Sequence, residues 1–336
     1  MKACRLWSLL ALSSLMAFLA GCDHGRTASV SGSATPVVPQ ASATPAAVHP
    51  EPAGPALRID SVRAWQYVKD IIAFGPRWDG SKGQQKLGEY LHSKLKNDQV
   101  EDDAFIADTP AGKIPMRNII AKFPGSKDGI ILLGSHIDTN YPLRKTSFVG
   151  ANDGAATTAL LLAIADQLRG KKLEGYSVWL AFLDGEESIP SARPGDLGWD
   201  DKFSLFGSRH LAQKWQQDGT TKKFKAFLLA DMIGDKDLDI QRDSNSTPWL
   251  EDLVLQAAQR LGYQSYFFDR TIEVSGDDHL PFKAAGVPVA DIIDLDYGYN
   301  DAFHHTVEDT LDKISPKSLQ ITGDVFLETI RLLNAR

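Results

Sequence analysis

Acidic and imidazole side chains recur at five places in this sequence, next to runs of apolar residues. The five segments are His136-Ile137-Asp138, Asn152-Asp153, Glu186-Glu187, Asp231-Met232-Ile233-Gly234 and His305-Thr306. One such residue after a strand is most often a capped or hydrogen-bonded structural residue, but five in the same topological position indicate a site. Carboxylate and imidazole donors without thiolate are typical of a catalytic rather than a structural zinc. The sequence therefore predicts a zinc site within residues 130–306.

Helices and strands alternate from residue 57 onward, and these elements must position the site. Apolar periodicity predicts helices at 61–74, 83–95, 155–168, 206–216, 248–261 and 315–333. Strands are expected at 118–123, 130–134, 177–183, 226–230, 266–268 and 287–293. Because the runs at 130–133 and 227–229 are continuously apolar, helices should cover both faces of their sheet. The predicted fold class is α/β, a three-layer α/β/α sandwich with a central mixed, mostly parallel sheet. Sites in such folds lie at the carboxyl ends of the strands.

The N-terminus is not expected to belong to this fold. Lys2 and Arg5 precede an apolar run at 6–20, which is short for a transmembrane helix and fits an export signal. The run ends in Leu-Ala-Gly before Cys22, which resembles the bacterial lipobox and implies cleavage before Cys22 and its lipidation. We therefore expect a signal peptide at 1–21 and an exported lipoprotein anchored on the periplasmic face of the cell envelope, in either membrane. An uncleaved anchor or a simple secretory signal is the alternative.

Composition divides the rest of the chain into a tether and a folded domain. Residues 22–55 are rich in Ala, Pro, Ser and Thr, so they cannot bury enough apolar surface to fold and should form a disordered tether. Residues 56–336 are the predicted catalytic domain. The second cysteine, Cys4, lies in the signal, so no internal disulfide is expected. With a formal net charge of -7 and no visible basic patch, the chain is not expected to bind nucleic acid. Membrane contact would be through the lipid anchor only.

The order and spacing of the five segments resemble those of the zinc aminopeptidases of peptidase family M28 and of their relatives, the animal-type glutaminyl cyclases. The resemblance extends from about Ile72 to the C-terminus. In both groups it implies that Glu186 is the acid/base. The zinc ligands implied in both groups are Asp153, Glu187 and His305. The residues that would complete a second zinc site in an aminopeptidase are His136 and Asp231. The resemblance thus implies one Zn²⁺ in a cyclase and two in an aminopeptidase.

Two stretches favour the cyclases. A long loop at 188–206, which contains Trp199, precedes a Gly-Ser-Arg string that in aminopeptidases follows the Glu-Glu pair within a few residues. The stretch Gly276-Asp277-Asp278-His279-Leu280-Pro281-Phe282 also resembles the cyclases, in which the residue at Asp277 belongs to the active site; a weaker match lies at 109–120. A cyclase would convert the N-terminal glutamine of a peptide or protein to pyroglutamate with release of ammonia. Asp231 and Asp277 would then hold the α-amine and share protons with Glu186.

Two features favour an aminopeptidase, which would hydrolyse N-terminal residues from peptides. His304 stands where cyclases carry a Trp, and the segment at 307–313 resembles an aminopeptidase ending. The candidate substrate-binding residues are Trp199, Phe303 and His304. A third interpretation is a metal- or peptide-binding lipoprotein without catalysis, but an intact acid/base beside the zinc argues against it.

Five further residues have structural interpretations. His210 is expected to be structural, and Asp138 is expected to orient His136 from outside the metal shell. His279 should pack or hydrogen-bond near the site. Asp184 and Arg209 could form an ion pair.

Overall fold

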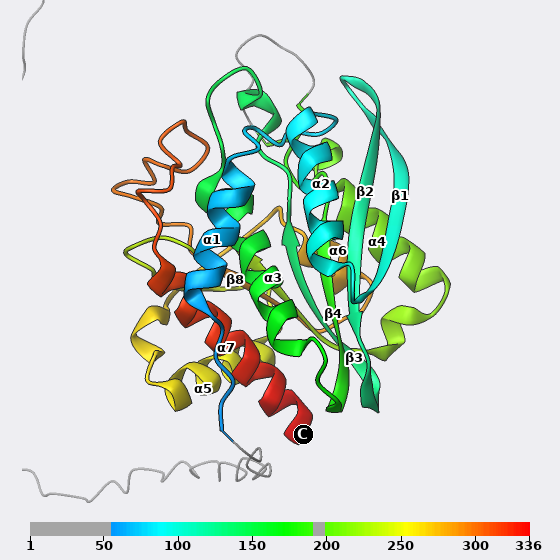
Figure 1. The fold of residues 1–336 in the computed structure, drawn as a ribbon, viewed down its shortest axis with the longest axis vertical. Coiled ribbons are helices and arrows are strands. Elements are labelled where there is room, and N and C mark those ends of the chain that lie inside the picture. The colour runs from blue at the N-terminus through cyan, green and yellow to red at the C-terminus, as the bar shows by residue number, and fades with distance from the viewer. Residues whose placement is uncertain (1–54, 191–198) are drawn as a thin grey trace, which may run out of the picture. The chain divides into compact units, whose positions relative to one another are not determined.

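The computed structural model describes residues 55–190 and 199–336 of the chain (Figure 1). The predicted signal peptide, Cys22 and the tether up to residue 54 lie outside the described residues, as does the part of the 188–206 loop at 191–198. Within the described ranges, no helix is long and apolar enough to span a bilayer. The description that follows concerns the compact unit to which these ranges belong.

The core of the fold is an eight-stranded mixed sheet in the order β1-β2-β4-β3-β5-β8-β6-β7. The strands are β1 (Gln99–Thr109), β2 (Gly112–Phe123), β3 (Gly125–His136), β4 (Leu173–Leu183), β5 (Phe224–Asp231), β6 (Ile240–Asp243), β7 (Phe267–Ile272) and β8 (Val289–Ile293). The central strands β4, β3, β5 and β8 are parallel neighbours, and β6 pairs in parallel with β7. The pairs β1–β2, β2–β4 and β6–β8 are antiparallel. The predicted mixed, mostly parallel sheet is confirmed.

Helices cover both faces of this sheet. They are α1 (Ser61–Ile72), α2 (Lys82–Leu95), α3 (Thr157–Leu168), α4 (Phe206–Gln217), α5 (Pro248–Leu261), α6 (His279–Ala284) and α7 (Pro316–Ala335). Successive residues of a strand point to opposite faces of the sheet. Accordingly Ile131 and Leu133 of β3 share a core with α1, α2, α3, α5 and α7, whereas Ile130 and Leu132 share one with α4 and α6. This is the predicted three-layer arrangement.

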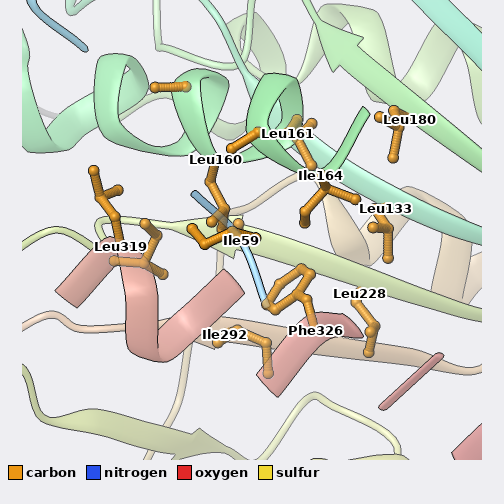
Figure 2. Close-up of a cluster of buried hydrophobic side chains, with 14 of the residues drawn as sticks. Ile59, Leu133, Leu160, Leu161, Ile164, Leu180, Leu228, Ile292, Leu319 and Phe326 are labelled. Atoms are coloured by element: carbon orange, nitrogen blue, oxygen red, sulfur yellow. The ribbon is translucent and has the colours of Figure 1, made fainter. Parts of the chain in front are cut away.

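The larger core lies between the sheet and helices α3 and α7. Figure 2 shows labelled side chains of the central strands pointing toward those of the two helices. The strand residues are Leu133, Leu180, Leu228 and Ile292, and the helix residues are Leu160, Leu161, Ile164, Leu319 and Phe326. Full burial of one such side chain stabilises the fold by about 1.5–3 kcal/mol. The packing therefore fixes the four parallel strands, and with them the edge that carries the polar segments.

Three elements were not predicted. Strand β1 alternates charged and apolar residues, pairs only with β2 and lies at the edge of the sheet, so its apolar signal is weak. Strand β6 has four residues and helix α6 has six, which is too short for periodicity to be recognised. Strand β2 begins at Gly112 rather than at 118 because the turn after Thr109 pairs it with β1 over its full length.

Candidate zinc centre and active site

The five polar segments meet at the carboxyl ends of the parallel strands, as predicted. His136 ends β3, Asp231 ends β5, and Glu186 and Glu187 follow β4 after Asp184 and Gly185. Asp153 comes from the segment η2 (Ala151–Ala156), which leads into α3. The remaining member, His305, lies in the loop between β8 and α7. Parallel strands expose their carboxyl ends at one edge, so residues more than a hundred positions apart become neighbours.

His305 lies between the two carboxylates of the predicted ligand set at distances that suit zinc. The Nε2 atom of His305 lies 3.4 Å from Oδ2 of Asp153 and 3.3 Å from Oε1 of Glu187. Two donors at about 2.0–2.1 Å from a tetrahedral zinc lie about 3.3 Å apart. Both carboxylate oxygens are buried and have no hydrogen-bond partner among the described residues, which a bound cation would supply. The residues therefore fit a zinc ion.

A second donor set shares Asp153 with the first. The Nε2 atom of His136 lies 3.2 Å from Oδ1 of Asp153 and 3.4 Å from Oδ1 of Asp231. The two ring nitrogens of His136 and Oδ1 of Asp231 are buried and without a hydrogen-bond partner in the described part of the chain. Asp153 thus offers one oxygen to each set. The geometry accommodates one ion or two.

Hydrogen bonds from outside the metal shell fix the position of Asp153. The backbone amides of Asn152 and Asp153 donate to the carboxylate of Asp309 at 2.8 and 3.1 Å. The Asn152 side chain donates to the carbonyl of Met232 and accepts from the amide of Gly234, which ties η2 to the chain after β5. These bonds are needed because Asp153 and the residue after it leave the helical conformation at the start of α3. Asp309 and Asn152 were not predicted as site residues.

The turn that carries Glu186 and Glu187 is held by Asp138. Its Oδ1 accepts the amide of Glu186 at 3.2 Å and its Oδ2 accepts the amide of Glu187 at 3.0 Å. The distance from Oδ1 to Nδ1 of His136 is 3.7 Å, which is long for a hydrogen bond. Asp138 thus lies beside His136 outside the ligand set, as expected, and its hydrogen bonds to the Glu186–Glu187 turn are a second role that was not predicted. Asn140 adds a bond from Nδ2 to Oε2 of Glu187 at 2.9 Å, a contact that was not predicted.

Glu186 is buried among other acidic groups. Burial raises its pKa well above the usual range; His136 lowers it, and Glu187, Asp277 and Asp278 raise it further. A bound cation would act in the opposite direction on this pKa. A carboxyl with a raised pKa can both accept and return a proton near neutral pH, which is what an acid/base requires.

Asp277 lies beside Glu186 and Asp231, as predicted. Burial raises the pKa of Asp277 well above its usual range, and the carboxylates of Asp291 and Asp231 raise it further. Neighbouring carboxylates oppose one another's ionisation, so this group of buried acids must retain some of its protons. His279 follows two residues later at the start of α6 and is completely buried, between Asp243 and Asp291.

Comparison with known proteins agrees with this geometry. The sequence model of peptidase family M28 matches residues 118–330. This chain belongs to peptidase family M28. A crystal structure of a glutaminyl cyclase from an Acidobacteriales bacterium is 52% identical, with a TM-score of 0.79 over 87% of this chain and 99% of that one. The chain therefore belongs to the glutaminyl cyclases within the family.

Two further relatives show how widely the fold is shared. The glutaminyl-peptide cyclotransferase-like protein of Bos taurus is 29% identical over 291 residues, which are 78% of this chain and 73% of the relative. A leucine aminopeptidase precursor from Bacteroides thetaiotaomicron is 25% identical, with a TM-score of 0.70 over 82% of this chain and 98% of that one. Zinc dependence is general in the family, and the donor atoms described above are the ones it needs.

The predicted pocket residues differ in their surroundings. Trp199 is 39% exposed, and its Nε1 donates to Oδ1 of Asp201 at 2.7 Å. A β-carbon added to Gly276 would lie 2.5 Å from Nε1 of the indole, so the ring lies against the backbone just before Asp277. This position suits a pocket wall, and a role in binding substrate stays a prediction.

The two other pocket candidates lie beside the ligand His305. The ring of His304 is centred 4.1 Å from that of His305, and its Nδ1 lies 3.2 Å from Oδ2 of Asp301. Phe303 packs edge-on against Tyr297 within its own loop. The contacts of Phe303 hold the loop, and its part in the pocket, like that of His304, stays a prediction.

Two structural predictions have opposite outcomes. His210 is structural, as expected: its Nδ1 lies 2.9 Å from Oδ2 of Asp103 and its ring stacks on Phe105. The predicted ion pair between Asp184 and Arg209 is wrong. Asp184 accepts from the amide of Arg117 and from Gln84, because it lies buried under β2 and α2. Arg209 instead donates to backbone carbonyls in the segment before α4.

One missed residue had a signal in the sequence. Asp291 is the single charged residue of β8, in the run Val-Ala-Asp-Ile-Ile, and it is fully buried. A carboxylate inside an apolar strand costs free energy unless it has a partner. Such a residue could have been singled out from the sequence alone.

Proposed function

We propose that this chain converts the N-terminal glutamine of peptides and proteins to pyroglutamate with release of ammonia, using one zinc ion held by Asp153, Glu187 and His305. The observation that carries the proposal is a buried Glu186 of raised pKa directly beside this ligand set. The similarity to a glutaminyl cyclase over nearly the full length of that structure supports the choice of reaction.

The reaction needs a proton carrier and a holder for a free amine. The α-amine attacks the γ-carbonyl carbon, a new C–N bond forms, and the bond to the amide nitrogen breaks. Glu186 takes a proton from the amine and returns it to the leaving nitrogen, so that no net proton is consumed by the enzyme. The carboxyl groups of Asp231 and Asp277 accept hydrogen bonds from the α-amine and exchange protons with Glu186. Bound zinc supplies Lewis-acid polarisation of the carbonyl.

The pocket for the glutamine side chain is proposed to lie between Trp199 and His304. The indole offers an apolar face beside Asp277, and the imidazole of His304 stands next to the ligand His305. An aromatic and an amphipathic ring can hold the methylene groups of glutamine while leaving its amide free.

Hydrolysis of N-terminal residues is the second candidate, because the His136 and Asp231 donor set is also intact. Incubation of the zinc-loaded protein with a Gln-Ala dipeptide separates the two. Loss of one ammonia from the dipeptide mass supports cyclisation, whereas free glutamine shows an aminopeptidase. Metal analysis of the same sample counts the ions: one per chain supports the proposal, and two with peptide hydrolysis overturn it.

We also propose that the enzyme is a lipoprotein held at the periplasmic face of the cell envelope through Cys22. The support is the basic start, the apolar run at 6–20 and the Leu-Ala-Gly-Cys ending. A Cys22→Ser variant should move from the membrane fraction to the soluble fraction. Retention of this variant in the membrane would show an uncleaved anchor instead.

A further inference from the structure

Three further buried ionisable side chains form a series that begins at Asp277. Asp291 of β8, His279 of α6 and Asp243 at the end of β6 are at most 1% exposed. The His279 Nε2 atom lies 3.1 Å from Oδ2 of Asp243, and its Nδ1 lies 3.5 Å from Oδ2 of Asp291. The carboxyl groups of Asp291 and Asp277 lie close enough for each to shift the pKa of the other. Side chains from β6, α6 and β8 thus form one continuous series of polar contacts.

The contacts require a definite number of hydrogens. Both nitrogens of His279, both oxygens of Asp291 and Oδ2 of Asp277 have no hydrogen-bond partner among the described residues. Three contacts need three hydrogens, which the ring and the carboxyl groups must supply between them. Fewer hydrogens would leave a buried contact between two acceptors, which is costly.

The far end of the series is rigid. Oδ1 of Asp243 accepts the amides of Val274 and Asn245, both at 3.0 Å, and its Oδ2 accepts the hydroxyl of Ser246 at 3.2 Å. The Ser246 Oγ atom in turn accepts the amide of Asp291 at 2.9 Å. Asp243 therefore has a fixed place and acts as the anchor of the series.

A buried metal ion is the other occupant that these donors could hold, since one atom from each of Asp243, His279 and Asp291 lies within 4.8 Å of the others. The oxygens of Asp243 already accept three hydrogen bonds, which leaves them few lone pairs for an ion. Metal analysis of the variants below distinguishes the two.

We propose that Asp243, His279 and Asp291 are positioning residues that hold the Asp277 carboxyl toward the substrate amine. The inference rests on the proposed function of the zinc site. Without the ring, the carboxyls of Asp291 and Asp277 lose their link to the Asp243 anchor, and Asp277 can turn away from Glu186. Removal of such a supporting partner typically costs 10- to 100-fold in activity.

The test is a double-mutant cycle on the full chain loaded with zinc. His279→Leu should lower kcat for a Gln-Ala dipeptide by about 10- to 100-fold, with KM within about threefold of the wild type. His279→Gln, which keeps one donor and one acceptor, should restore part of the loss. In the Asp277→Asn background, His279→Leu should add almost nothing, because both changes act on the same group. His210→Gln removes a His–Asp contact of similar length elsewhere and should keep full activity.

Three outcomes would overturn the inference: wild-type kcat in His279→Leu, multiplication of the two losses in the double variant, or loss of one bound metal ion beyond the catalytic zinc. If His279→Leu does not fold, Asp243→Asn is the second variant, because it removes the anchoring charge and keeps the size of the side chain. It should give a smaller fall in kcat. In the Asp277→Asn background this fall should disappear. The proposed function fails separately, if the wild-type protein releases glutamine instead of ammonia.

Discussion

At the scale of single residues, proton transfer and metal binding are assigned to neighbours in the sequence: Glu186 is the acid/base and Glu187 is a metal ligand. Oε2 of Glu187 accepts a hydrogen bond from the side-chain amide of Asn140, and its Oε1 faces His305. The neighbours of Glu186 include other carboxylates. Adjacent residues after a strand point in different directions, so one turn can supply both a ligand and an acid/base.

Replacement of Glu186 by Gln should lower kcat by about 10²- to 10⁴-fold, because the amide cannot carry a proton between the amine and the leaving nitrogen. Zinc content should stay unchanged, since Glu186 is outside the ligand set. Ammonia release at saturating dipeptide measures the effect. Glu89→Gln, an exposed change of the same kind on α2, is the matched control. Turnover of Glu186→Gln at the wild-type rate would remove the acid/base role.

Asp138→Asn tests the hold on the Glu186–Glu187 turn. Asn has one acceptor oxygen and cannot accept both amides, so Glu187 should be less well placed for zinc. We expect zinc affinity to fall by about 10- to 100-fold, as for other groups that orient metal ligands. Competition with a chromophoric chelator measures this, with Asp70→Asn on α1 as control. An unchanged affinity would show that Asp138 is dispensable for the metal site.

The site residues that could be predicted from the sequence are those next to an element end. Glu186 and Glu187 are recognisable because they follow an apolar run after only two residues, Asp184 and Gly185. Asn140, Asn152 and Asp309 could not be predicted, since their partners lie up to 157 positions away and the contacts exist only after the loops have packed. The bonds of Asp138 to the Glu186–Glu187 turn were missed for the same reason: the two segments are 48 and 49 positions apart and meet only on folding.

At the scale of elements, the central strands were predictable and the edges were not. The strands β3, β4 and β5 are buried on both faces, so their composition alone distinguishes them. Edge strand β1 has one solvent-facing side, and its pairing with β2 rather than its own residues determines its length. The short helix α6 is fixed by contacts of His279 and Phe282 in the interior, which no local pattern reveals.

The entry to α3 is the element on which the metal site depends most. Gly154 has a φ of +93°, and a β-carbon there would lie 2.8 Å from the carbonyl oxygen of Asp138 and 3.2 Å from Cε1 of His136. Gly154→Ala should therefore displace Asp153 and lower zinc affinity by at least about tenfold, about 1.4 kcal/mol. Isothermal titration of the metal-free variant with zinc measures the loss.

Gly170→Ala is the control for backbone strain alone. Gly170 also has a positive φ, +72°, but a β-carbon there would meet no atom within 4 Å. It should cost about 1–2 kcal/mol of stability through strain and leave zinc affinity unchanged. Equal zinc affinities for the two variants would show that the metal site tolerates movement of η2.

At the scale of the whole molecule, the fold concentrates negative charge at one edge of the sheet. The carboxylate ligands Asp153 and Glu187 are buried there with Glu186, Asp277 and Asp291, and positive charge comes mainly from histidines and from fully buried Arg77. The folded chain tolerates this charge by retaining protons, and by binding zinc when the metal is present. Stability should therefore depend on pH differently with and without the metal.

Three buried aspartates set the direction for the chelated protein. Burial raises the pKa of Asp184, Asp278 and Asp294 to about 7 in each case, against about 3.9 in the unfolded chain. Because the folded state binds more protons between these values, the stability they contribute is complete below about pH 4 and is lost as pH rises through about 7. Each group would remove about 1 kcal/mol of the free energy of unfolding between pH 6 and 8.

Urea unfolding of the chelated protein should therefore show a lower free energy of unfolding at pH 8 than at pH 6. His305, whose pKa is raised to about 9 by Glu187 and Asp153 against the effect of burial, changes stability in the same direction over this interval. With zinc in excess the fall should shrink or reverse, because ligand deprotonation makes metal binding tighter at higher pH and binding adds to stability. A chelated protein that is equally stable at both pH values would mean that these carboxyls are ionised in the fold, and that the negative charge at the sheet edge is compensated by groups other than bound protons.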